Sequence, residues 1–251
     1  KDYVVYLALD ISMLWNRYVI VRIALIYRGR ALPLSWIVLE HRSASVAFED
    51  YKPILSEAAA ILPKGCRVIL LADRGFEDND LFRKARDLGW GFCIRLKKST
   101  RVYRASKPST NIERLMPTRG KALFLHKVWL SDRFFGPVHL ALAHVQTSNG
   151  YQEWAVVSDE PTGLHTFDVY GLRFDLEENF LDDKSAGFQL ESSEIRDARA
   201  LSRLGLVLAT ATLYLVSTGT AVVCLELRHQ VDTHWCRGLS YFQIGWRWIK
   251  H

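Results

Sequence analysis

The sequence predicts an α/β fold in which a mixed β-sheet is flanked by helices. Apolar runs with strand character alternate with helical stretches, and a short glycine turn joins two of the early runs. A third observation is a β-rich segment that interrupts this alternation before helical character returns. Such an order favours a sheet covered by helices over an all-α or all-β fold. The 251 residues, 49% of them hydrophobic, suit one large domain with an insertion.

Residues 1–96 are expected to form the first part of the core. The runs before and after 28-RGR-30 should pair as an antiparallel hairpin. Pro53 predicts a kink in the first helix, and Gly89 is a suitable cap at the end of the second. The expected strands are 3–10, 17–27, 31–41, 67–73 and 91–96, and the expected helices are 46–62 and 77–89.

The character of the chain changes at residues 97–163, where short strand-like runs are separated by polar, Pro and Gly residues. We expect a β-rich insertion there and the second part of the core, with a Glu-bearing helix and C-terminal helices, at 164–251. Leu204 to Leu225 carries no charge over 22 residues. Because it holds several Gly, Ser and Thr residues, we interpret it as a buried amphipathic helix that ends near Ser217, rather than as a membrane span.

Charge and cysteine content narrow the partners and the compartment. The formal net charge of +6 is compatible with an anionic partner, although many basic proteins have such a charge. The four cysteines show no paired spacing, which favours a reducing compartment over a disulfide framework. The chain starts at Lys1 and runs directly into an apolar strand without a signal peptide, so we expect it to be a fragment or a trimmed chain.

Three acidic residues point to a metal site. Asp10 and Asp73 are each expected at the end of a strand, and the helix predicted over 170–184 carries Glu177. If that helix packs across the strand ends, three carboxylates meet at one point. Three hard oxygen ligands suit Mg²⁺ or Mn²⁺, and two such ions support phosphodiester chemistry.

The helix predicted over 170–184 has an unusual polar stripe. With about 100° per residue, Tyr170, Arg173, Glu177 and Lys184 lie within about 60° of one another. Such a stripe does not suit a core-facing surface. Arg173 and Lys184 would donate to phosphates, and Tyr170 would bind a phosphate or stack on a base.

Each of these residues also has an ordinary structural interpretation. An aspartate after a strand commonly caps a turn, and an Arg–Glu pair four residues apart commonly forms a surface ion pair. Only the combination of the three carboxylates with the stripe favours chemistry on DNA.

At this point the sequence resembles the DDE transposases of bacterial insertion sequences, in the group with a Y-(2)-R-(3)-E-(6)-K signature. Tyr170, Arg173, Glu177 and Lys184 fit that spacing without adjustment. The stretches that resemble the family's two aspartate blocks and its C-terminal segment are 7-LALDIS-12, 72-ADRGF-76 and 237-RGLSYFQIGWRW-248.

The resemblance implies a ribonuclease-H-like core with a β-rich insertion before the Glu helix. It implies metal-dependent cleavage and strand transfer at transposon ends, with Asp10, Asp73 and Glu177 holding Mg²⁺ or Mn²⁺ ions, two of them expected. It also implies double-stranded DNA as the partner, no membrane, a homodimer on DNA and a prokaryotic cytoplasmic, nucleoid-associated location. The expected DNA-contacting residues are Tyr170, Arg173, Lys184, Arg74, Trp154 and Trp129.

Some of these assignments stay open at the level of sequence. In relatives an aromatic residue of the insertion stacks on a flipped base, but ordinary packing on a β face explains Trp154 and Trp129 equally simply. Arg74 is as well suited to an ion pair as to a phosphate. The family usually carries an N-terminal DNA-binding region before the first aspartate, and we do not expect such a region in this sequence. The alternatives are a catalytically inactive or domesticated DNA-binding remnant, or a ribonuclease-H-like nuclease that cuts without joining.

Overall fold

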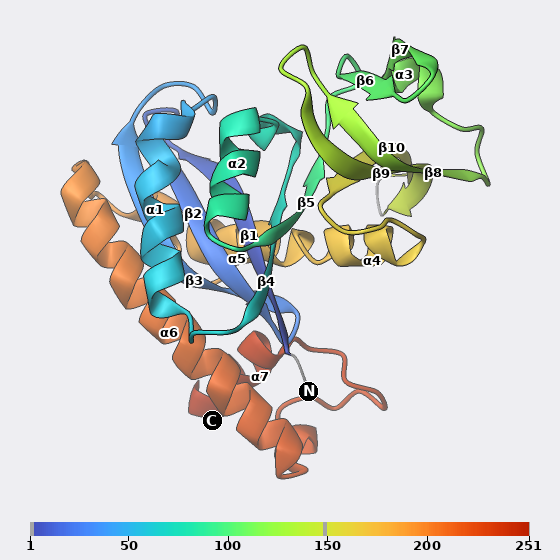
Figure 1. The fold of residues 1–251 in the computed structure, drawn as a ribbon. Coiled ribbons are helices and arrows are strands. Elements are labelled where there is room, and N and C mark those ends of the chain that lie inside the picture. Colours follow the sequence, from blue (N-terminus) through green and yellow to red (C-terminus); the bar gives the residue numbers. More distant parts are fainter. Residues whose placement is uncertain (1–2, 148–149, 251) are drawn as a thin grey trace. The chain divides into compact units, whose positions relative to one another are not determined.

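The computed structural model describes residues 3–147 and 150–250 and divides the chain into two compact units (Figure 1). The first unit comprises residues 1–9 and 45–173, and the second comprises residues 10–44 and 174–251. Strand β1 (Val4–Leu14) contributes to both.

The first unit is built on a mixed sheet with the strand order β1-β4-β5-β10-β9-β8-β6-β7. Parallel pairing joins β1 to β4 (Arg67–Ala72) and β4 to β5 (Gly91–Arg95). The three strands are apolar on both faces, as expected of parallel strands covered by helices. The mixed α/β class is therefore confirmed, with strands close to the predicted runs 67–73 and 91–96.

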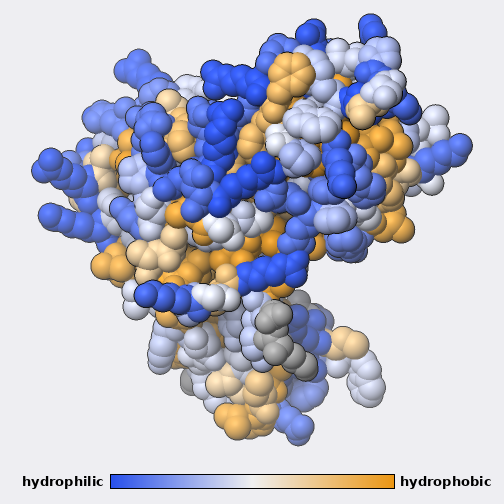
Figure 2. All heavy atoms as spheres, in the orientation of Figure 1, coloured by the Kyte–Doolittle hydropathy of each residue, from blue (hydrophilic) through white to orange (hydrophobic). Residues whose placement is uncertain are grey.

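Helices α1 (Phe48–Ile61) and α2 (Asn79–Asp87) lie side by side in the first unit (Figure 1). Hydrophilic side chains gather over these two helices on the face shown in Figure 2. The helix α1 continues through Pro53 without a break. Asp78 caps α2 by accepting the Asp80 N–H at 2.8 Å, and Gly89, at a φ of +72° that is typical of glycine caps, follows the end of the helix.

The segment predicted to be β-rich consists mainly of strands. Strand β10 pairs antiparallel with β5, so these strands extend the sheet of the first unit. The elements are β6 (Arg101–Arg104), β7 (Lys107–Asn111), α3 (Ile112–Leu115), β8 (Ala122–Leu130), β9 (Phe135–Thr147) and β10 (Gly150–Ser158).

The second unit contains the predicted hairpin, formed by β2 (Tyr18–Tyr27) and β3 (Arg30–Glu40). These strands pair antiparallel, and both turn residues, Arg28 and Gly29, have positive φ. This is the backbone that a two-residue hairpin turn requires, so the hairpin prediction is confirmed.

Strand β1 does not end at Asp10, as the sequence suggested, but continues to Leu14. A turn follows the strand at Trp15 and Asn16, which both have positive φ, and the Arg17 N–H donates to the Leu14 carbonyl at 3.1 Å. The residues that follow Asp10, ISML, are compatible with a strand, so the strand continues until the tight turn at Trp15 and Asn16. Asp10 is therefore an internal residue of β1.

The prediction of a single helix over 170–184 is also wrong. Helix α4 (His165–Gly171) ends before Arg173, α5 (Phe174–Leu181) follows, and η2 (Asp182–Ala186) is a π-helical turn. Gly171 is a poor helix former, and the N–H groups of residues 172 and 173 bond three residues back rather than four. The break places Tyr170 and Arg173 in the first unit, and Glu177 and Lys184 in the second.

The apolar segment near the C-terminus forms one long helix, α6 (Ala198–Cys224), which does not end at Ser217 as predicted. It packs against α7 (Tyr241–Lys250), and the short turns η3 (Leu190–Ser192) and η4 (Leu227–Gln230) precede and follow α6. Asp197 caps α6 by accepting the Ala200 N–H at 2.7 Å. By length and composition alone α6 is able to cross a membrane, a property that it shares with core helices of soluble proteins.

Candidate active site

Asp73 directly follows β4, at the carboxyl end of a parallel strand, as predicted. Its Oδ1 accepts the Gly75 N–H at 2.7 Å, which starts the short 3₁₀ turn η1 (Arg74–Phe76). The ordinary capping role is therefore real, but it occupies only one carboxylate oxygen. The side chain is half-buried, and Arg74 beside it is exposed. The carboxyl end of a parallel strand is a usual place for a site, so both side chains suit ligand contact.

The Tyr170 phenol is fully buried and packs edge-on against Trp154, with ring centroids 4.9 Å apart and planes at 80°. The guanidinium carbon of Arg173 lies 5.8 Å from the centroid of the same ring, and Arg173 is 4% exposed. Burial raises the pKa of the Tyr170 phenol, while the Arg173 and Arg95 guanidiniums oppose that rise. In this conformation the three side chains form a packed cluster rather than an open DNA-binding surface.

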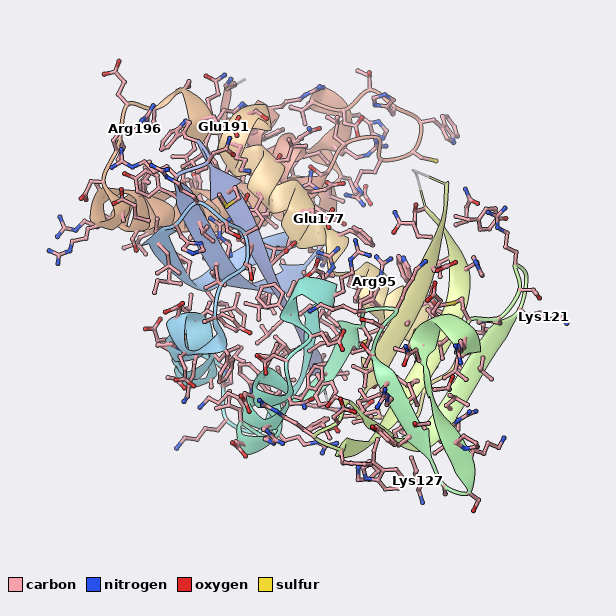
Figure 3. All side chains as sticks on the ribbon, turned by 90° about the horizontal axis from the view of Figure 1, so that it is seen from above. Arg95, Lys121, Lys127, Glu177, Glu191 and Arg196 are labelled. Atoms are coloured by element: carbon pink, nitrogen blue, oxygen red, sulfur yellow. The ribbon has the colours of Figure 1, made fainter. Side chains whose placement is uncertain are left out.

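Arg95, at the end of β5, is a further charged residue near Tyr170, and it was not among the residues predicted from the sequence (Figure 3). Its guanidinium donates to the Glu153 carbonyl at 2.9 Å, which ties β5 to β10. Arg95 begins a basic stretch of the chain, but only the fold brings it close to Tyr170.

Trp129 lies on β8, paired with Tyr103 of β6, and is half-buried. Trp154, by contrast, is 3% exposed. Of the two tryptophans predicted to stack on a base, only Trp129 presents part of its ring to solvent in this structure.

Asp10 and Glu177 both belong to the second unit. Asp10 is half-buried, and its Oδ1 accepts the N–H of Ile11 at 2.8 Å. Glu177 lies in the first turn of α5, where the exposed carboxylate also benefits from the helix dipole (Figure 3). Lys184 lies in the π-helical turn η2 and is half-buried.

Two buried arginines of the β2–β3 hairpin hold the helix that carries Glu177. The Arg22 guanidinium donates to Asn179 Oδ1 at 2.7 Å and to Asp183 Oδ2 at 2.6 Å. Arg22 also lies over the Phe180 ring, with its guanidinium carbon 4.7 Å from the centroid. These contacts hold α5 and η2 against the hairpin, and hence they orient Glu177.

The second arginine, Arg30, contacts Glu178 and lies 3.2 Å from Asp182 Oδ2. Burial raises the pKa of Asp182 to about 6, and the neighbouring Asp183 and Glu178 carboxylates act in the same direction, against Arg30. Sequence reasoning missed both arginines. Arg22 gave a signal, because it stands in the middle of an apolar strand, where an unpaired charge is costly, whereas Arg30 begins its strand directly after the turn and gave none.

The structure thus distributes the predicted residues over both units. Asp73, Arg74, Trp129, Trp154, Tyr170 and Arg173 lie in the first, and Asp10, Glu177 and Lys184 lie in the second. Within residues 3–147 and 150–250, no group of three or more His, Cys, Asp or Glu side chains is arranged to hold a metal ion.

A comparison with protein families decides the family. Residues 17–214 match the model described as the transposase DDE domain. This chain belongs to the transposase DDE domain family. The matched range includes Asp73 and the four residues Tyr170, Arg173, Glu177 and Lys184, while Asp10 precedes it. The mixed sheet with flanking helices agrees with the ribonuclease-H-like fold expected of a DDE domain.

Solved structures resemble this DDE domain only distantly. A piggyBac transposase synaptic complex with hairpin DNA has a TM-score of 0.47 at 12% identity, over 82% of this chain and 45% of that one. An Argonaute from Marinitoga piezophila with guide RNA and target DNA has a TM-score of 0.28 at 10% identity, over 69% and 25%. The chain thus spans less than half the length of either. No curated protein matches the sequence.

Transposases of the DDE family generally use divalent metal ions, and the acidic residues of this domain have suitable chemistry. Asp73 keeps its second carboxylate oxygen, Oδ2, without a hydrogen bond to the residues that the structure describes. Aspartate and glutamate carboxylates are hard oxygen ligands, which Mg²⁺ and Mn²⁺ prefer over nitrogen or sulfur.

Proposed function

We propose that this chain is the catalytic domain of a DDE transposase that cleaves DNA strands at transposon ends and joins them to target DNA. The observation that carries the proposal is the family match over residues 17–214. The spacing of Tyr170, Arg173, Glu177 and Lys184 supports membership of the insertion-sequence group with that signature. The remnant and nuclease alternatives are less favoured, because the signature residues and the carboxylates are all present.

In this proposal Asp10, Asp73 and Glu177 would hold two Mg²⁺ or Mn²⁺ ions. When bound, the ions would activate an attacking oxygen and stabilise the leaving oxygen of a phosphodiester. Water attacks phosphorus at the transposon end and releases a 3′-hydroxyl, which then attacks a target phosphodiester in the same manner. Arg74 and Lys184 would bind phosphates, and the half-buried Trp129 would position the DNA end. Tyr170, Arg173 and Trp154, which pack together in this structure, would have to become exposed before they could contact the DNA end.

The proposal extends to assembly and location. A domain that joins paired transposon ends is expected to act as a homodimer on double-stranded DNA. We also propose a prokaryotic cytoplasmic location at the nucleoid and no membrane association, so that the long helix α6 serves as a core helix.

The first test is nicking of supercoiled plasmid, because that substrate does not require the unknown end sequence. We expect nicking with Mg²⁺ or Mn²⁺, none with EDTA and none from Glu177→Gln. Glu191→Gln is the control, since it removes an exposed carboxylate of the second unit that is not among the contacts of Arg22 and Arg30. Nicking that survives Glu177→Gln would contradict the catalytic assignment, and DNA binding without nicking in any metal would favour the inactive remnant.

A further inference from the structure

A hollow of about 620 Å³ lies beside Asp73 in the first unit. Three separate segments line it: the turn that starts at Asp73, the turn after β5 and the start of α3. The lining residues are Asp73, Arg74, Gly75, Lys97, Lys98, Ser99, Asn111 and Glu113. Three cations and two carboxylates line this one open space.

Glu77 holds the basic turn in place. Its Oε2 accepts the Lys97 N–H at 2.5 Å, and its Oε1 accepts the Thr100 hydroxyl. Glu77 follows the 3₁₀ turn that starts at Asp73, so a single side chain links the two walls of the hollow.

A second set of hydrogen bonds fixes the same turn from α3. The Ile112 N–H donates to the Thr100 carbonyl at 3.0 Å, and the Glu113 N–H donates to the Lys98 carbonyl at 3.0 Å. A turn held on both sides is preorganised, which reduces the entropy lost when a ligand binds.

The cations of the hollow differ in their partners. The Lys98 ammonium lies 2.5 Å from a Glu153 carboxylate oxygen, so an acid of the first unit already neutralises it. Arg74 and Lys97 are exposed and form no ion pair with an acidic side chain of the described residues. Their charge therefore remains available to an anion.

We propose that Arg74 and Lys97 bind a phosphate of the DNA backbone next to Asp73, and that Glu77 is the positioning residue that holds Lys97 there. The inference rests on the proposed function, because DNA is the phosphate source that a DDE domain would bring to Asp73. Lys97 and Glu77 are not part of the signature that suggested the family.

The test measures binding of the chain to a fluorescein-labelled 30-base-pair duplex over a salt series in EDTA, where no cleavage occurs. Each phosphate contact contributes about 0.9 to the slope of log K against log salt. We expect Lys97→Gln and Arg74→Gln each to reduce that slope by about 0.9. Lys98→Gln is the matched control, and it should keep the wild-type slope because its partner is Glu153.

Glu77→Gln tests the positioning role. An amide offers one acceptor oxygen where the carboxylate offers two, so the turn should lose one of its two bonds. We expect the slope of Glu77→Gln to fall as in Lys97→Gln, and Glu77→Gln with Lys97→Gln to bind no more weakly than Lys97→Gln alone. Additive losses would overturn the positioning role.

The failures can be told apart. If the wild-type chain shows no salt-dependent binding to the duplex, the proposed function falls. If the wild type binds but Lys97→Gln keeps its slope, the phosphate site falls and the function stands. Displacement of DNA by millimolar inorganic phosphate at constant ionic strength would assign the hollow to free phosphate and overturn the DNA assignment. Lys97 is exposed, so its substitution should leave the melting temperature unchanged.

Discussion

Arg22 and Asp183 form a buried ion pair, with Nη1 and Oδ2 2.6 Å apart and side chains 2% and 3% exposed. The pair joins strand β2 to the π-helical turn after α5, across 161 residues of sequence. Because α5 carries Glu177, a charge buried in the β2–β3 hairpin bears on the orientation of a predicted catalytic residue.

Arg22→Met should destabilise the protein strongly. The substitution leaves the Asp183 carboxylate buried without its partner, and breaking such a pair typically costs about 3–5 kcal/mol. Urea unfolding followed by circular dichroism measures the change. Unchanged stability would contradict the view that the pair is buried in solution.

A second variant separates stability from orientation. Arg22→Met combined with Asp183→Leu removes both charges, and apolar replacement of a buried pair is often neutral for stability. We expect this double variant to recover most of the unfolding free energy but to nick plasmid more slowly than wild type. Wild-type nicking would show that the pair serves the fold and not Glu177.

Asp182→Asn should remove a pH dependence of stability. The folded-state pKa of Asp182 is raised to about 6 from an ordinary 3.8, so the folded state binds the proton more tightly than the unfolded state. The stability from this group is fully present below about pH 4 and is lost as pH rises through about 6. Between pH 7 and pH 4, wild type should therefore gain stability relative to Asp182→Asn. Parallel stability curves for the two proteins over this range would be the contrary result.

Trp154→Ala and Trp129→Ala should behave differently. Trp154 is buried against Tyr170, so truncation should cost about 3–5 kcal/mol of stability. The half-buried Trp129 should cost less, and if it stacks on a base it should lower DNA affinity without unfolding the protein. Paired measurements of melting temperature and duplex affinity check both. A loss of affinity in Trp154→Ala with unchanged stability would contradict the packing role.

Gly219→Ala should destabilise the contact between α6 and α7. A Cβ on Gly219 would lie 1.8 Å from the Tyr241 carbonyl oxygen and 3.0 Å from the Gly245 nitrogen. The two backbones must separate to admit a methyl group, which we expect to cost about 1–3 kcal/mol or more. Gly171→Ala is the control, because its Cβ would meet no atom within 4 Å. Equal stability of the two variants, measured by thermal unfolding, would exclude this close approach.

The local elements followed from local chemistry. Turn residues with positive φ at Arg28 and Gly29 produced the predicted hairpin, and the Asp78 cap and Gly89 stop bounded the predicted second helix. Apolar runs of strand length became strands because both faces of a parallel sheet are buried. The spacing from Tyr170 to Lys184, together with the two aspartate blocks, predicted a DDE transposase, and the comparison then established the transposase DDE domain.

Three features of the structure differ from the predictions or were missed by them. The helix over 170–184 breaks near Arg173, and β1 continues past Asp10. The third feature is the pairing of Arg22 with Asp183. A helical wheel assumes an unbroken helix. It therefore does not show whether a glycine such as Gly171 ends one helix before the next begins.

By itself the sequence determined most of the elements, their order and the identity of the acidic and basic residues, because turn chemistry, hydrophobic periodicity and motif spacing are local properties of the chain. Only the tertiary structure decided the partners of those residues. Burial of Tyr170 against Trp154, the ion pairs of Arg22 and Arg30, and the link from Glu77 to Lys97 all join segments at least 16 residues apart. Such contacts depend on which faces the packed sheet and helices bring together, and no local pattern encodes them.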